Sequence, residues 1–341
     1  MKQIALGLLL ILPAQEKAPV RVTLSESGSF SALVRELSTQ CGVTIAIDPS
    51  VDDKQIKVSV REATVLQALD ALCRAHKGAT YLGGANAWPP PRHLTLRAGD
   101  WVDYPSVTAG EFKILLDGWQ RTKEITDAGA DETQRLSLSA LAPPNLRILL
   151  NGKETWSFSS IKDGKDNDLL LKESSEADGW DRTRLPLKTI GRHVGISRAV
   201  RVRPFDKDAG LKLIEGVLEA DVVELEDVTI SLDAGKETAT ALGTFVVSSS
   251  TPVKGSSRPE TRVTLSLKEG TSLADAFEGF GTTDKAEDRW DYVNPTIKGA
   301  IAEFQVRAQD PGWIVLRIRK NTRRVKIPFR FENLSFAGEK K

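Results

Sequence analysis

Apolar residues recur with two different periods along this 341-residue chain, and the change of period limits the folds that it can adopt. Between residues 30 and 76 they recur every three or four positions, which is the spacing of amphipathic helices. From residue 106 onward they alternate with polar residues, which is the spacing of half-buried strands. The sequence therefore predicts an α+β multidomain protein, with an α/β module followed by β-sheet units.

Two helices are predicted in the first part of the chain. Five residues share one face of the first helix: Phe30, Leu33, Val34, Leu37 and Cys41. Gly42 follows, at the position where a left-handed residue commonly ends a helix. The second helix begins after Thr64, which forms a T-x-x-Q capping box with Gln67, and Gly78 is expected to end it.

Short alternating or β-branched runs flank these helices. They cover residues 20–24, 43–47, 56–60, 79–82 and 93–96. With the helices they give the order β-α-β-β-α-β and one further strand. In this order two helices can cover one face of a small sheet, so residues 20–99 are predicted to form a compact module.

The module resembles the secretin and TonB short N-terminal (STN) domain. The resemblance depends on a set of positions that the family pattern shares with this chain: Leu33, Leu37, Gly42, Asp48, Pro49, Val51, Val58, Ala68, Leu69, Leu72 and Tyr81. It implies a non-catalytic periplasmic interaction unit. In that family the unit precedes a channel or receptor barrel, but the rest of this chain lacks the regular strands of such a barrel. Its general style resembles that of uncharacterised envelope proteins of planctomycete-like bacteria.

The remaining residues predict antiparallel β-sandwiches of the immunoglobulin-like kind, because short strands follow one another at intervals of about 8–12 residues. We expect two sandwiches, at residues 106–205 and 206–336, and one larger sandwich is the alternative. Residues 211–232 and 313–336 favour two related halves, because each contains an alternating strand followed by an acidic-polar-apolar-polar-apolar run. A helix is expected at residues 272–280.

The first residues predict export. Residues 1–14, MKQIALGLLLILPA, combine a lysine, a short apolar run and a small residue at a cleavage position after Ala14. The run is shorter than the roughly 20 residues that cross a bilayer. We therefore expect a cleaved signal peptide and a periplasmic or secreted mature chain without a membrane span, although a buried N-terminal strand or helix would have a similar composition.

Charge and cysteine content limit the partners and cofactors. The chain has 47 basic and 46 acidic residues, so its charge gives no reason to expect nucleic acid or an anionic membrane. An oxidising compartment would permit a disulfide between Cys41 and Cys73. The alternative is that both are small buried hydrophobic residues on helix faces. Three scattered histidines have no metal-ligand spacing, so no metal or cofactor is expected.

Several segments have both a structural and a functional interpretation. Trp88, Trp101 and Tyr104 border a proline-rich stretch, where they either pack one domain on the next or form a sugar- or peptide-binding patch. The acidic residues 163–168 are expected at a hairpin tip, because they lack the spacing of a calcium loop. The basic residues between Arg317 and Lys326 are expected on the solvated face of a hairpin, and a polyanion-binding surface is the alternative.

No motif for nucleophilic, zinc or phosphate chemistry occurs in the sequence. The function expected is that of an exported, non-catalytic adaptor that binds an envelope protein through its N-terminal module. A carbohydrate- or cell-wall-binding protein is the first alternative. A glycan-active enzyme is the second, with the carboxylate pairs Asp221/Glu224 or Asp288/Asp291 as its acid and base.

Overall fold

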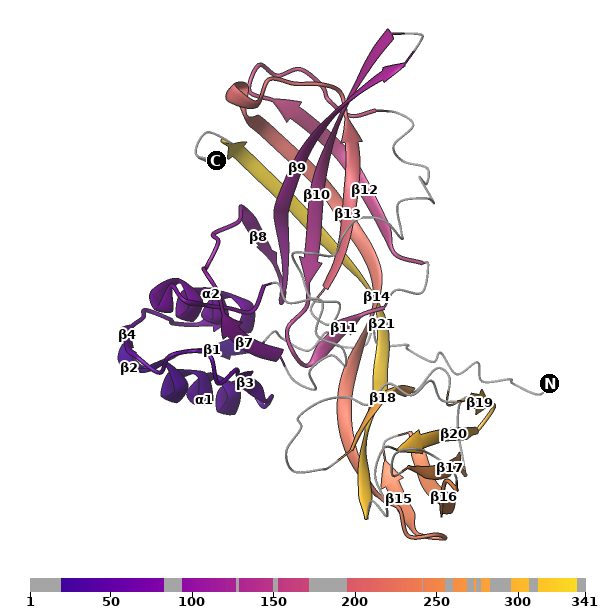
Figure 1. Ribbon diagram of the computed structural model, residues 1–341. Coiled ribbons are helices and arrows are strands. Elements are labelled where there is room, and N and C mark those ends of the chain that lie inside the picture. The colour runs from indigo at the N-terminus through magenta and orange to yellow at the C-terminus, as the bar shows by residue number, and fades with distance from the viewer. Residues whose placement is uncertain are drawn as a thin grey trace, which may run out of the picture.

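The computed structural model describes residues 20–82, 94–126, 129–149, 153–171, 195–240, 242–254, 260–268, 273, 277–282, 296–306 and 312–335. The described residues are mostly β, with 60% in strands, several antiparallel sheets and two α-helices near the N-terminus. The helices lie in an N-terminal module, which is beside a β unit that we call the upper unit, at the top of Figure 1 (β8–β13 with part of β14 and β21). A second β unit, which we call the lower unit, contains β15–β20 and the other part of β14 and β21 (Figure 1). Within the described residues no helix is long and apolar enough to cross a membrane.

The two helices form where the sequence predicts them. Helix α1 is Phe30–Cys41; the Ser29 hydroxyl accepts from the Ala32 N–H at its start, and Gly42 is left-handed at its end. Helix α2 is Val65–His76, and both hydrogen bonds of the predicted capping box are present. The left-handed residue that ends α2 is Lys77, with φ of 65°, one position before the expected glycine.

The prediction of one small sheet in the module is wrong. Three sheets form instead: β1 (Arg21–Val22) with β5 (Ala63–Thr64), β2 (Ser27–Ser29) with β4 (Gln55–Lys57), and β7 (Leu94–Ala98) between β3 (Ile45–Ile47) and β6 (Ala79–Thr80). Only the β3–β7 pair is parallel among these. Most of these strands have two or three residues. The first two sheets are linked by backbone hydrogen bonds from the Leu24 N–H to Val60 and from the Val58 N–H to Glu26, at 3.1 and 3.0 Å.

The upper unit consists of two sheets packed face to face. The first has the order β13-β10-β9-β8, from strands β8 (Ser106–Ala109), β9 (Phe112–Thr126), β10 (Gly129–Leu141) and β13 (Gly195–Val202). The second places β11 (Leu146–Ile148) and β12 (Thr155–Asp163) on β14 (Leu211–Ser231), which pairs with β21 (Trp313–Leu334). One buried cluster joins Leu116 and Leu138 of the first sheet to Leu218 and Phe329 of the second.

The lower unit uses the other half of the same long strands. Its sheet has the order β15-β16-β17-β20-β19, from β15 (Glu237–Thr240), β16 (Gly243–Pro252), β17 (Thr261–Leu267), β19 (Thr296–Lys298) and β20 (Ile301–Val306). Phe245 and Phe304 of this sheet share a core with Ile230 of β14 and Leu316 of β21. The predicted helix at residues 272–280 is wrong at its end, because Phe277–Thr282 is strand β18 on the edge of β21.

Strands β14 and β21 form one antiparallel ribbon that runs from the Leu211–Leu334 pair to the Ser231–Trp313 pair. The hairpin expected between Arg317 and Lys326 is therefore wrong, since these residues belong to one strand, and the left-handed residue Asn321 forms a bulge in it without reversing its direction. The ribbon also explains the similarity of the two halves, because the similar segments are its two strands. The expected domain boundary after residue 205 stays a prediction, and the upper core combines residues on both sides of it.

A single bulge in β21 places the apolar residues of its two halves on the same face of the ribbon. Even-numbered residues such as Leu316 and Ile318 face the lower core, whereas odd-numbered residues such as Ile327 and Phe329 face the upper core. From Ile214 onward, strand β14 uses even-numbered residues in both cores. Between its two halves, the Val222–Arg323 and Glu224–Lys320 pairs leave one β14 residue opposite two β21 residues. The extra residue changes the alternation of β21, so both cores lie on the same face of the ribbon.

Candidate interaction site at the module junction

Helix α2 lies between the rest of the N-terminal module and the upper unit. Eight of its residues are buried: Val65, Leu66, Ala68, Leu69, Asp70, Leu72, Cys73 and His76. Helix α1 buries a single face of four residues, as an ordinary amphipathic helix does. On the other side of the junction, Leu115 and Leu141 belong to the outer face of β9 and β10 and join the hydrophobic cluster of the module. Helix α2 thus packs against both the N-terminal module and the upper unit.

The centre of the junction is a buried ion pair. Lys113 Nζ of β9 contacts Asp70 Oδ2 of α2 directly, and the Tyr81 hydroxyl donates to Asp70 Oδ1 at 2.7 Å. Asp70, Lys113 and Tyr81 are 8%, 4% and 4% exposed. Burial, together with the negative charge of Asp70, holds the pKa of Tyr81 well above its ordinary value. The hydroxyl therefore stays protonated and donates to the carboxylate.

Aromatic residues pack beside the ion pair. The Trp101 ring centroid lies 5.9 Å from Lys113 Nζ and 5.9 Å from the Tyr81 ring centroid. Trp101 and Tyr104 are partly buried and pack against the module core. The structure thus places both residues at the junction, where one of the two sequence interpretations expects them. Trp88, the third candidate of that group, lies outside the described residues.

The rim of the junction is polar and exposed. Arg74 of α2 donates to both oxygens of Asp103, at 2.7 and 3.1 Å, and both side chains are more than half exposed. Nearer the start of α2, Gln67 donates to the Thr108 hydroxyl at 3.4 Å. The junction therefore has a dry charged centre and a wet charged rim, which resembles the anatomy of a protein–protein interface.

Both cysteines are free thiols in the structure. Cys41 is half-buried at the end of α1, and Cys73 is buried in α2. Burial, with a further contribution from the charge of Asp70, raises the pKa of Cys73 to about 12. A thiol in this state is not a nucleophile at neutral pH.

The described histidine is a packed structural residue. His76 Nε2 lies 2.8 Å from the Asp52 carbonyl oxygen, and the Gly78 N–H donates to Nδ1 at 3.2 Å. This arrangement assigns the ring proton to Nε2. The ring packs on Phe30, with centroids 4.4 Å apart. The other two histidines lie outside the described residues.

The carboxylates considered for glycan chemistry are engaged by neighbouring side chains. Asp221 accepts from Arg324 at 3.2 Å, and Glu224 accepts from the Asn321 side-chain amide at 3.0 Å. Asp288 and Asp291 lie outside the described residues. The part of the chain that is described contains no cluster of three metal-ligating side chains.

The acidic segment at residues 163–168 forms a closed turn. Asp163 accepts from the Lys165 N–H, the Asn167 N–H and the Asn167 side-chain amide, at 2.8–2.9 Å. Burial of Asp163 works to raise its pKa, but these hydrogen bonds outweigh burial and leave the pKa below its ordinary value. In a calcium loop such a carboxylate would bind the ion. Here the Asp163 carboxylate accepts hydrogen bonds from the turn instead.

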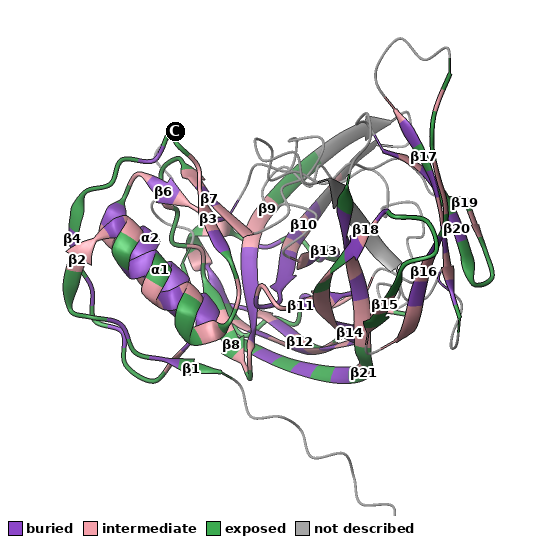
Figure 2. Cartoon of the chain, turned by 90° about the horizontal axis from the view of Figure 1, so that it is seen from below, coloured by how far each residue is buried: buried purple, intermediate pink, exposed green. Residues whose placement is uncertain are grey.

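The basic residues of β21 are paired with acids across the ribbon. Directly opposed pairs are Glu215–Arg330, Glu219–Lys326, Asp221–Arg324 and Asp227–Arg317, with contacts of 2.7–3.2 Å. Alternation of these residues with buried ones is visible along β21 (Figure 2). The ladder balances charge along the ribbon, which removes the reason to expect a polyanion there.

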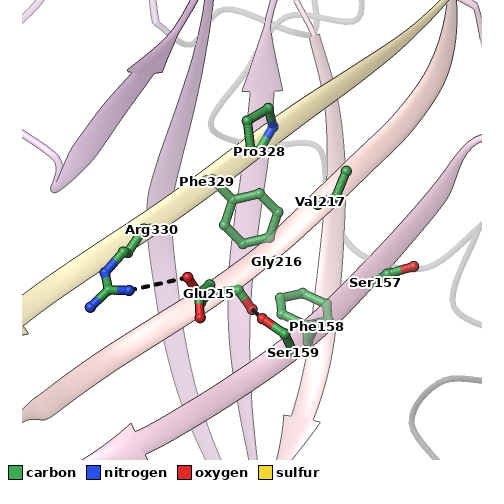
Figure 3. Close-up of a pocket in the computed structure, with 9 residues that line it drawn as sticks. All are labelled: Ser157, Phe158, Ser159, Glu215, Gly216, Val217, Pro328, Phe329 and Arg330. Atoms are coloured by element: carbon green, nitrogen blue, oxygen red, sulfur yellow. Dashed lines mark hydrogen bonds and ion pairs between the residues drawn. The ribbon is translucent and has the colours of Figure 1, made fainter.

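A groove of about 420 Å³ crosses β12, β14 and β21. Its residues come from three neighbouring strands: Ser157, Phe158, Ser159, Glu215, Gly216, Val217, Pro328, Phe329 and Arg330 (Figure 3). The Glu215–Arg330 ion pair, at 3.2 Å, lies at one end. Ser157, Val217 and Pro328 are opposed in register across the three strands. The groove combines apolar surface with hydroxyl and charged groups.

Sequence reasoning missed the central ion pair, although one signal for it was present. Asp70 lies between Leu69 and Ala71 in a largely apolar helical segment. Lys113 interrupts the apolar run at the start of β9. Two opposite charges in such positions are each costly to bury alone and compatible when paired. The sequence does not state that α2 and β9 are neighbours, so the pair emerges only from the fold.

No protein-family model, no curated protein and no solved structure matches this chain.

Proposed function

We propose that this protein is an exported, non-catalytic scaffold of the cell envelope that binds a partner protein through its N-terminal module. In this proposal the module is STN-like, and the β units are immunoglobulin-like sandwiches that hold it in a fixed orientation. The rigid junction supports the proposal, because a buried ion pair and a shared helix oppose rotation of the module about its linker. The envelope location depends on the predicted signal peptide, which lies outside the described residues.

The observation that carries the proposal is the outer edge of β3. This strand pairs with β7 on one side, and it lies at the end of its sheet. The Asp48 N–H donates to Leu96 on β7, so the N–H groups of Ile45 and Ile47 point to the opposite side. There the Ile45 N–H donates to the Ser38 hydroxyl at 3.2 Å, and the Ile47 N–H is the group that would pair with a partner strand. Strand β3 contains neither a charge nor a proline. Such an edge can accept an extended strand of another protein by β-augmentation.

A second edge strand in the same molecule carries residues that protect it against pairing with another chain. Residues 325–334 of β21 pair with β14 on one side, and this stretch contains Lys326, Pro328 and Arg330. Lysine and proline on an edge strand oppose further pairing. The contrast favours β3 as the edge that receives a partner.

The test is site-specific photo-crosslinking in the envelope of a cell that expresses the full chain. A photoreactive residue at position 47 should capture one discrete partner, and the same residue at position 326 should not. The variant Ile47→Pro should lose the partner and keep the circular dichroism spectrum and melting temperature of the wild type. A partner that binds equally well to Ile47→Pro, or to the chain without residues 20–99, would overturn the proposal.

The groove in Figure 3 favours one alternative function, binding of a cell-wall saccharide. Its apolar surface would contact a sugar ring, and Glu215, Arg330 and the serine hydroxyls would bond to sugar hydroxyls. Titration calorimetry with soluble peptidoglycan fragments tests this alternative. Binding that disappears in Glu215→Gln and persists in Glu219→Gln, outside the groove, would support it, whereas no heat with the wild type would remove it.

A further inference from the structure

Asp70 and Lys113 present the two functional groups of an amide to each other across the module junction. The carboxylate belongs to α2 and the amine to β9, and they are in direct contact. We propose that these side chains condense into an isopeptide bond, which links the N-terminal module covalently to the upper β unit. This inference is independent of which partner the protein binds.

The surroundings of the pair favour condensation. The side chains of Lys113 and Asp70 are 5% and 12% exposed, and Trp101, Leu115 and Leu141 are packed around the junction. Two buried charges carry a large desolvation cost, which a neutral amide does not have. A dry site also keeps bulk water, the reagent of the reverse reaction, away from the bond.

The positions of both groups are fixed before any reaction. Asp70 is held by the Tyr81 hydroxyl and by the packing of α2, and Lys113 is held by the register of β9 between β8 and β10. An amine and a carboxyl that are kept in contact react as one molecule, so the entropic part of the barrier is already met by folding.

The atoms and charges of the step balance within the pair. A proton moves from the Lys113 ammonium to Asp70 Oδ2, which gives a neutral amine and a carboxylic acid. The amine lone pair attacks Asp70 Cγ, and the new C–N bond forms while negative charge develops on Oδ1. The Tyr81 hydroxyl already donates to Oδ1, so it stabilises this charge. A second proton moves from nitrogen to Oδ2, the Cγ–Oδ2 bond breaks, and one water leaves without any oxidation or reduction.

Intact-mass spectrometry of the full chain, purified and then denatured, tests the proposal. The wild type should be lighter, by the mass of one water, than the chain calculated from its sequenced N-terminus. Fragmentation of a protease digest should give one branched peptide that joins residues 70 and 113. Lys113→Arg and Asp70→Ala should both restore the full mass, and Tyr81→Phe should lower the cross-linked fraction.

The wild-type measurement is decisive by itself, so it does not depend on whether the variants fold. A wild-type mass equal to that of the unmodified chain, unchanged after prolonged incubation of the folded protein, would overturn the proposal. A loss of water that persists in Lys113→Arg would also overturn it, because the loss would then come from another part of the chain.

Discussion

The molecule has two joints, and they are built in opposite ways. The N-terminal module meets the upper unit through side chains, with a dry ion pair at the centre and aromatic rings around it. The lower unit meets the upper unit through two continuous strands whose opposed ion pairs range from half-buried, as in Asp227–Arg317, to exposed, as in Glu215–Arg330. Both joints contain carboxylates paired with basic groups, but burial makes the first pair far more consequential than the second.

The largest effect is expected at the first joint. Asp70→Ala leaves the Lys113 amine buried without a partner, so its free energy of unfolding should lie about 3–5 kcal/mol below that of wild-type chain in which the pair is ionic and not condensed into an amide. Chemical denaturation followed by tryptophan fluorescence measures this change. The double variant Asp70→Leu with Lys113→Met should recover much of the loss, because it removes both charges. A loss below about 1 kcal/mol in Asp70→Ala would show that the pair is wetter than its burial indicates.

Asp163 sharpens the comparison, because it is a buried carboxylate that is satisfied by amide donors. Asp163→Ala should lower the free energy of unfolding by about 1–3 kcal/mol near pH 7. Since the folded pKa is lowered, this contribution is complete above the ordinary value of about 3.9 and is lost as the pH falls through the folded pKa. Denaturation series at several pH values should therefore show the wild type and the variant converging in acid. A constant difference would contradict the assignment.

The third prediction concerns the bulge in the second joint, between the two halves of the β14–β21 ribbon. Asn321 has a φ of 52°, which a β-branched residue adopts only with strain. Asn321→Val should cost about 1–2 kcal/mol. Asn321→Gly, the matched control, should retain most of the stability, because glycine accepts this conformation freely. Thermal melts of both variants make the comparison, and equal melting temperatures would argue against a left-handed residue at this position.

The smallest effects are expected from exposed ion pairs. Arg74→Ala at the rim of the first joint and Lys326→Ala on the ribbon should each change the free energy of unfolding by less than about 1 kcal/mol. The same denaturation assay measures both, at low and at high salt. An effect of either variant that approaches that of Asp70→Ala would remove the distinction between the two joints.

Local features were accessible to sequence reasoning, and associations between distant segments were not. The helices and the Thr64 capping box follow from spacing and from local hydrogen bonding, so they were predicted closely. The single module sheet was wrong because most strands of the module have only two or three residues, and no local pattern tells which of such short strands pair. The hairpin in β21 was wrong because the change from even to odd apolar positions, a bulge signal, also suits a turn.

At the candidate site, too, local features could be predicted and contacts between distant segments could not. Tryptophan beside a proline-rich stretch was expected to pack domains together as one of two interpretations, and Trp101 lies at the junction. The Asp70–Lys113 pair could not be predicted, because its members are 43 residues apart and no local pattern connects them. Its burial depends on the face that α2 turns toward β9, which is a property of the assembled fold.

The lower unit begins and ends at neighbouring points. Ser231 is paired with Trp313, and the Leu232 N–H donates to the Gly312 carbonyl at 3.0 Å. The chain therefore leaves the ribbon and returns to it at one place, as it would around an insertion. A lineage could acquire, exchange or discard such a unit without rerouting the backbone of its host, and a protein engineer has the same freedom to fuse a foreign cargo there.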